Sequence, residues 1–150
     1  MRGRAGRENL PGEVVIQTYN PDNFSIEYAK KQDYDLFYNT EIMLRQRLKY
    51  PPFCDIIMVT FSSNYENEAQ KMAKMWHETL NKIKKDEYLI YPPMPAPISK
   101  IKNKYRYRMI IKCNLSNHII DILNEVMQKQ ETWKIKSTRV AIDVNPSNMM

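Results

Sequence analysis

A double proline, Pro51-Pro52, constrains the fold of this chain more than any other pair of residues. Proline cannot continue a helix, and it moves the preceding residue out of the helical region, so the amphipathic helix predicted over residues 34–49 must end at a corner. The sequence FCDIIMVTF follows the corner and is rich in the β-branched and aromatic residues that favour strands. We therefore predict that residues 33–52 connect an N-terminal segment, residues 1–32, to a compact domain over residues 53–150.

The residues after the corner alternate between strand and helix patterns. The patterns predict a strand over residues 53–62 and then a helix that opens with a capping box at Ser63 and Glu66 and runs to Ile83. A proline-interrupted edge strand over residues 88–101 and a strand over residues 105–113 follow. The last two predicted elements are a helix capped by Ser116 and a strand with Val140, Ile142 and Val144 on one side. Both faces of the first strand are apolar, which favours a central place in the sheet. This β-α-β-β-α-β order predicts an α+β, ferredoxin-like fold in which both helices cover one face of an antiparallel sheet.

The N-terminal segment has a different character. All three glycines of the chain lie in its first dozen residues, as part of a Gly/Arg-rich loop, which indicates that the two ends of the chain belong to different pieces of structure. A short strand is predicted over residues 14–19 and a short helix over residues 24–31. A single strand is not stable by itself, so we expect it to join the later sheet or to belong to a sheet that lies mostly outside this chain.

A cluster of basic and aromatic residues precedes and begins the strand at residues 105–113. The formal net charge is +6, and five cations fall within nine residues beside two tyrosines: Lys100, Lys102, Lys104, Tyr105, Arg106, Tyr107 and Arg108. Strand alternation places Arg106 and Arg108 on one face and the tyrosines on the other. The cluster is either a surface that follows a phosphate backbone, with tyrosines that stack on bases, or a solvated polar face above a core that contains the tyrosines. The sequence leaves both interpretations open.

Several other classes of site are disfavoured. Cys54 and Cys113 form neither a disulfide framework nor a metal-ligand pair, and His77 and His118 are isolated, so we predict no metal site. No apolar run has the length needed to cross a membrane, and the basic N-terminus is not followed by the apolar region of a signal peptide, so a cytoplasmic protein without membrane partners is expected. The sequence lacks a phosphate-binding P-loop, so this chain is not expected to be an enzyme by itself.

The order of short motifs resembles that of one family. GRAGR, PGEVVIQTYNPD, LRQRLKYPPF, PAPISKIKNKYRYRMIIK and AIDVNP follow one another as in the C-terminal part of the PriA family of bacterial primosomal replication-restart DNA helicases. The resemblance covers nearly the whole chain. Three residues depart from the family pattern: Met1 and Arg2 replace Val and Ala, and Asn145 replaces the second Asp of DVDP.

The resemblance implies a function for each part of the chain. Residues 1–32 would be the end of the second helicase lobe, with Arg4 and Arg7 as the motif VI arginines that supply positive charge to the transferring phosphoryl group in the intact enzyme. The remainder would be the C-terminal DNA- and partner-binding domain of an ATP-dependent 3'–5' DNA helicase. The implied partners are forked or single-stranded DNA, the single-stranded DNA-binding protein, primosome proteins and the remaining motor lobes of the parent protein. No cofactor is expected in this chain, whereas the parent would use ATP and Mg and would carry zinc in a module absent here.

Two alternatives belong to other classes of protein. A free-standing RNA-binding module has the same β-α-β-β-α-β order, although Lys104-Tyr105-Arg106-Tyr107 lacks the glycine expected beside its exposed aromatics. A scaffold domain would instead dock through the second face of the first strand, which carries Cys54, Ile56 and Met58. Because a sheet face without helices is normally polar, we expect a partner or the helix before the corner to cover these side chains.

Overall fold

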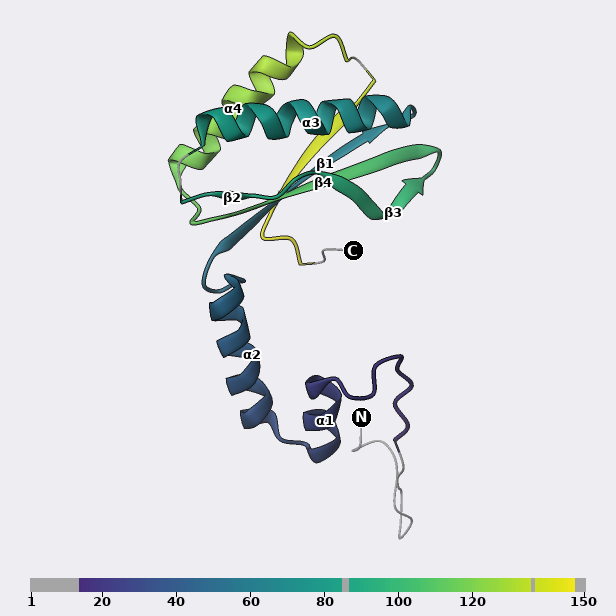
Figure 1. Ribbon diagram of the computed structural model, residues 1–150, viewed down its shortest axis with the longest axis vertical. Coiled ribbons are helices and arrows are strands. Elements are labelled where there is room, and N and C mark those ends of the chain that lie inside the picture. The colour runs from purple at the N-terminus through teal and green to yellow at the C-terminus, as the bar shows by residue number, and fades with distance from the viewer. Residues whose placement is uncertain (1–13, 85–86, 136, 148–150) are drawn as a thin grey trace. The chain divides into compact units, whose positions relative to one another are not determined.

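A computed structural model describes residues 14–84, 87–135 and 137–147 of the chain (Figure 1). The described elements are α1 (Phe24–Lys31), α2 (Tyr34–Leu48), β1 (Asp55–Ser63), α3 (Glu66–Ile83), β2 (Leu89–Ile90), β3 (Met94–Ile101), β4 (Lys104–Cys113), α4 (Asn117–Glu131) and β5 (Arg139–Val144). The chain divides into two compact units, Met1–Met43 and Leu44–Met150, which we call the N-terminal and C-terminal units. The division falls within α2. The domain boundaries that were placed after residues 32 and 52 from the sequence stay predictions.

The described part of the N-terminal unit contains α1 and the first part of α2, and both helices were predicted. Asn23 caps α1 because its side-chain oxygen accepts the backbone N–H of Ser25 at 2.9 Å, and Gln32 ends the helix in the left-handed conformation at φ 57°. The strand predicted over residues 14–19 was wrong, since these residues are irregular and exposed. Val15 is 84% exposed, and β-branched residues form a stable strand only when a partner strand and an apolar cover are available.

The C-terminal unit contains an antiparallel sheet with the strand order β2-β4-β1-β5, and β3 pairs with the other part of the same edge of β4. Both α3 and α4 lie on one face of this sheet (Figure 1). The predicted ferredoxin-like α+β fold is therefore confirmed, with β1 in a central position between β4 and β5. We call the sheet face opposite α3 and α4 the open face.

The core lies between the sheet and the two helices. Phe61 from β1 and Trp76 from α3 are fully buried, with ring centroids 5.8 Å apart in an edge-on arrangement. The indole N–H of Trp76 donates to Gln130 Oε1 at 2.9 Å, which connects α3 to α4 and satisfies a polar group that burial would otherwise penalise. The other fully buried side chains with the largest volumes are Tyr88, Ile57, Leu80, Met109, Ile111, Ile119, Val59 and Val126.

The start of α3 differs from the prediction. Ser63 is still part of β1, and its hydroxyl accepts the N–H of Tyr65 at 3.2 Å and lies 3.0 Å from the hydroxyl of Ser137. The capping box predicted at Ser63 and Glu66 was therefore wrong, because the Ser63 side chain is already used between strand and loop. Tyr65 occupies the N-cap position instead, without a side-chain hydrogen bond to the helix.

Candidate nucleic-acid interface

The β3–β4 hairpin ends in a two-residue turn that presents lysines to solvent. Lys102 and Asn103 both have positive φ angles, 48° and 60°, as in the type I′ turns whose twist matches that of the flanking strands. Lys100, Lys102 and Lys104 are exposed on and beside this turn. We call these three lysines the hairpin tip. Three of the predicted cationic residues therefore lie together at one end of the sheet.

The positive charge of the chain is concentrated in this part of the sequence. Residues 88–120 contain six Lys and Arg and no Asp or Glu, whereas the remaining 17 Lys and Arg are matched by 17 Asp and Glu. The entire formal net charge of +6 thus comes from the segment that forms β2, β3 and β4. Such a local excess attracts polyanions from a distance and raises their association rate.

The two faces of β4 separate its aromatic and basic residues, as predicted. Tyr107 is 8% exposed and belongs to the core with Met109 and Ile111. Its hydroxyl donates to Glu66 Oε1 at 3.4 Å, and burial, together with the charge of Glu66, raises the pKa of Tyr107. Burial favours the core interpretation for Tyr107, and the DNA-binding role suggested for it stays a prediction.

A row of cations crosses the open face next to the hairpin tip. Arg106 on β4 and Arg139 on β5 are both register partners of Ser62 on β1, so the three side chains lie on one line across the sheet. We call Arg106 and Arg139 the arginine row. Arg139 was not among the predicted binding residues, although the alternation that places Val140 on the core side also places its neighbour Arg139 on the open face.

Arg108 follows Arg106 on the same face but is more deeply covered. Its side chain is 9% exposed, and burial lowers the pKa of its guanidinium, with the like charge of Arg106 acting in the same direction and the carboxylate of Asp143 opposing both. A cation in this position contacts a ligand only through its outermost atoms. Arg108 therefore lies at the inner limit of the cationic surface.

Lys112, the last cation on this face of β4, supports the structure. Its ammonium donates to the carbonyl oxygen of Leu48 at 2.9 Å and lies 3.6 Å from the ring centroid of Tyr50, which precedes the double proline. The Leu48 carbonyl belongs to the last turn of α2, where the negative end of the helix dipole favours a positive charge. Lys112 thus fastens the corner to the sheet, and at 6% exposure it is not available to a polyanion.

The beginning of β1 and the end of β5 are joined by a cluster of hydrogen bonds. The Asn145 side chain donates to Asp55 Oδ1 at 2.8 Å and accepts the N–H of Ile56 at 2.9 Å, while the N–H of Leu115 donates to Asp55 Oδ2 at 2.8 Å. These bonds lower the pKa of Asp55, and the bond from Asn145 has the largest effect. The residue that departs from the family's DVDP pattern is therefore a structural clamp in this chain.

A shallow hollow of about 500 Å³ opens beside the hairpin tip, at the start of α3. It is lined by Asn64, Tyr65, Glu66, Asn67, Gln70 and Tyr105. Lys100 borders it, because the Lys100 ammonium lies 3.4 Å from the Tyr105 hydroxyl and 4.7 Å from the centroid of that ring. Figure 1 shows the turn of the hairpin at the same end of the sheet as the start of α3. The predicted residue Tyr105 thus faces a cavity, although on the helix side of the sheet.

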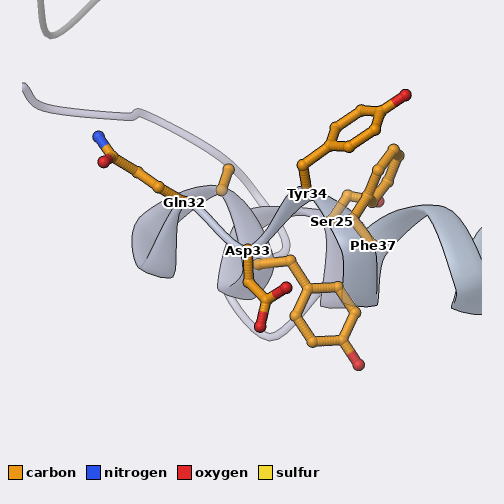
Figure 2. A pocket seen from close by; sticks show the side chains of 7 residues that line it. Ser25, Gln32, Asp33, Tyr34 and Phe37 are labelled. Atoms are coloured by element: carbon orange, nitrogen blue, oxygen red, sulfur yellow. The ribbon is translucent and has the colours of Figure 1, made fainter.

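A second hollow belongs to the N-terminal unit. Side chains of α1 and α2 line a space of about 340 Å³, and Figure 2 shows Ser25, Tyr34 and Phe37 among them. No side chain of these two helices is buried, and Tyr34 is 70% exposed. The predicted motif VI residues Arg4 and Arg7 lie outside the described residues, so the structure does not place them.

Within the described ranges, no group of three His, Cys, Asp or Glu side chains is arranged to hold a metal ion. Cys54 and Cys113 are free thiols, and burial raises the pKa of Cys113 to about 11, which keeps it protonated and a poor metal ligand. None of the described helices is both long and apolar enough to span a bilayer.

The fold and the cationic surface define a small α+β domain with a basic hairpin. Residues 46–147 match the family model of the primosomal protein N C-terminal domain, and the chain belongs to this family, which confirms the resemblance seen in the sequence. It is 35% identical to the replication restart protein PriA of Bacillus subtilis, over 99% of this chain and 18% of that protein. The PriA proteins of Chlamydia pneumoniae and Borreliella burgdorferi are each 32% identical, over 96% and 99% of this chain and 19% and 22% of their own lengths. The chain thus spans about a fifth of the curated relatives it matches.

Proposed function

We propose that this chain is the C-terminal DNA- and partner-binding domain of a primosomal replication-restart helicase that moves 3'–5' on DNA with ATP. Membership of the family supports the proposal that the parent protein is a replication-restart helicase. One structural observation supports the role in DNA binding. The hairpin tip and the arginine row carry exposed or half-buried cations on adjoining parts of one sheet, in a chain whose other charges balance. The proposed partners are forked or single-stranded DNA, the single-stranded DNA-binding protein and primosome proteins.

The type of contact follows from the side chains. Lysines on a turn and arginines on a sheet neutralise phosphates by charge and hydrogen bonding, which requires no particular base sequence. Each cation that touches a phosphate releases bound counterions, so the logarithm of affinity falls with the logarithm of salt by roughly 0.9 per contact on duplex DNA and roughly 0.7 on a single strand. We therefore expect binding that is independent of sequence and strongly dependent on salt.

The observed sheet faces disfavour the two alternatives. An RNA-recognition module stacks bases on aromatics of its open face, whereas β4 presents Arg106 and Arg108 there and places Tyr107 in the core. A scaffold that docks through Ile56 and Met58 requires these side chains to be accessible, but they are only 3% and 5% exposed. Their burial leaves little apolar surface there for a docking partner.

The test compares two double variants of equal charge. Replacing Lys102 and Lys104 by Ala removes two cations from the hairpin tip, and replacing Lys71 and Lys74 by Ala removes two exposed cations from α3. Titration of labelled single-stranded and duplex DNA at several salt concentrations will show a lower affinity and a lower salt slope for the tip variant alone. Equal affinities and slopes for both variants would contradict the assignment of the hairpin tip to DNA.

In this proposal, ATP is bound and hydrolysed by the rest of the parent protein. Arg4 and Arg7 would contribute positive charge there, and ATP, Mg and the zinc module would be held by residues outside this chain. We expect the 150-residue chain to hydrolyse no ATP with Mg and DNA present, since its sequence lacks a P-loop. DNA-stimulated ATP hydrolysis by the pure chain, measured by phosphate release, would overturn this division of labour.

A further inference from the structure

The hollow at the start of α3 differs in chemistry from the cationic surface beside it. Its six lining residues include two tyrosines, Tyr65 and Tyr105, and three side-chain amides, from Asn64, Asn67 and Gln70. None of these six residues is Lys or Arg, and the sixth is the acidic residue Glu66. A carboxylate without a neighbouring cation in the lining repels phosphate, so the hollow suits a neutral ligand.

From this juxtaposition we infer that the hollow receives one unstacked nucleobase of a DNA single strand whose phosphates are held at the hairpin tip. This inference rests on the proposed function and deepens it, because it specifies which part of the nucleic acid enters which part of the surface. A nucleobase is planar and uncharged, and its edge carries both hydrogen-bond donors and acceptors. Aromatic rings and amide groups recognise these properties together.

The two tyrosines contribute differently. Tyr65 is 61% exposed, and its backbone N–H is held by the Ser63 hydroxyl at 3.2 Å, so its ring is presented to solvent from a fixed backbone. Tyr105 is half-buried, and the Lys100 ammonium already lies over its ring at 4.7 Å. Tyr65 is therefore the stacking surface, and Tyr105 forms the wall that connects the hollow to Lys100.

The amide groups supply the polar part of the site. Asn64, Asn67 and Gln70 each offer a donor and an acceptor, and all three are exposed. The Glu66 carboxylate accepts the Tyr107 hydroxyl at 3.4 Å, and it can also accept an amino group of a base edge. The position of Lys100 beside Tyr105 places positive charge at the rim of the hollow, where the phosphate of a bound nucleotide belongs.

A duplex does not offer a base to this hollow, because its bases remain stacked and paired. The inference therefore predicts two separable modes of binding. Phosphate contacts at the hairpin tip serve both duplex and single strand, whereas the hollow adds affinity only for a single strand with bases. A strand of abasic sugar-phosphate tests the first mode without the second.

The experiment uses the full 150-residue chain with three labelled probes of equal length: oligothymidylate, an abasic strand and a duplex. The wild-type chain is expected to bind oligothymidylate more tightly than the abasic strand. Tyr65→Ala is expected to weaken binding of oligothymidylate by about five- to a hundredfold, the effect of one stacked base, and to leave binding of the abasic strand and the duplex unchanged. Gln70→Ala keeps the stacking ring and is expected to give a smaller loss with the same selectivity.

Tyr91→Ala is the matched control, because Tyr91 is also an exposed tyrosine, at 44%, but lies beside Ile110, five residues further along β4 than Tyr105. It is expected to bind all three probes as the wild-type chain does. Unchanged binding of oligothymidylate by Tyr65→Ala, with the duplex still bound, would overturn this inference and leave the proposed function standing. If the wild-type chain bound none of the three probes, the proposed function would fail first, and this inference with it.

Discussion

The two ends of β4 carry the same residue types in the same alternation and perform different tasks. Lys104, Tyr105 and Arg106 form the outer end, which is exposed or half-buried, while Tyr107, Arg108 and Lys112 belong to the inner end and are 8%, 9% and 6% exposed. The face of each residue is set by strand alternation at both ends. The two ends differ in burial: Tyr107 belongs to the core between sheet and helices, and Lys112 lies against the double-proline corner, whereas Lys104 at the hairpin turn is exposed. Residue type and periodicity therefore do not decide between binding and stability.

Replacing the matched tyrosines gives the largest expected contrast. Tyr107→Ala removes a large side chain from the core and is expected to lower the free energy of unfolding by about 3 kcal/mol, with unchanged DNA affinity per folded molecule. Tyr105→Ala is expected to cost less than about 1 kcal/mol and to weaken single-strand binding instead. Urea denaturation and DNA titration of the two variants measure both effects. Wild-type stability of Tyr107→Ala together with a loss of DNA affinity would reverse the assignment of the two ends.

The matched lysines provide the second contrast. Lys112→Met keeps an apolar stem but removes the charged hydrogen bond to Leu48 and the contact with the Tyr50 ring, for an expected loss of about 2 kcal/mol. Lys104→Met, at the exposed outer end, is expected to change stability by less than about 0.5 kcal/mol. Chemical denaturation of both variants measures this difference in stability. Equal stabilities would show that the corner is held by other contacts.

Asp55, which begins β1 and pairs with Cys113 at the end of β4, is expected to make the stability of the fold depend on pH. Because the folded state lowers the pKa of Asp55, it binds this proton more weakly than the unfolded chain, whose Asp has a pKa of about 3.9. The resulting stability is present above that pH and is lost as the pH falls through the lower folded pKa. Asn145→Gly removes the hydrogen bond that contributes most to the lowered pKa of Asp55, while glycine still allows the left-handed backbone at φ 48°. This substitution is expected to lower the free energy of unfolding by about 1.5 kcal/mol at neutral pH.

The pH dependence separates this effect from a general loss of packing. The difference in stability between the wild-type chain and Asn145→Gly should narrow below about pH 4, where Asp55 becomes protonated in both. The hydrogen bond from Ile56 to Asn145 is lost at every pH, so some difference remains. A difference that is constant from neutral to acid pH would show that Asp55 does not depend on Asn145.

Local patterns in the sequence were sufficient for the fold of the C-terminal unit. The apolar stripe of α3 and the alternation in β1 and β4 depend on helix and strand periods alone, and the four prolines between β2 and β3 and within β3 correctly indicated a broken edge strand. The capping box at Ser63 failed because the hydroxyl bonds to Ser137, which is far away in the sequence. The strand over residues 14–19 failed because β propensity says nothing about the presence of a partner strand.

The candidate site was harder to predict from the sequence, because it too depends on contacts between residues that are far apart in the chain. The five cations near the turn were found by their density, and their alternation was correct. The structural role of Lys112 could not be predicted from the sequence, since it depends on Leu48 and Tyr50, which lie more than 60 residues earlier in the chain. Arg139 was missed because it lies more than 30 residues after the basic cluster, and only the pairing of β1 with β5 brings it into line with Arg106.

The smallest and most specific prediction concerns Arg139. It tests whether the DNA-binding surface continues from the hairpin tip across the sheet to β5. Arg139 is exposed on β5, so Arg139→Ala is expected to leave the free energy of unfolding within about 0.5 kcal/mol of the wild-type value. If the arginine row touches one phosphate through this residue, the salt slope falls by roughly 0.9 on duplex DNA or roughly 0.7 on a single strand. Lys129→Ala on α4, where Lys129 pairs with Glu125, is the control that should leave the slope unchanged. An unchanged slope for Arg139→Ala, with a reduced slope for Arg106→Ala, would confine the DNA-binding surface to the β3–β4 hairpin and exclude the far strand of the sheet.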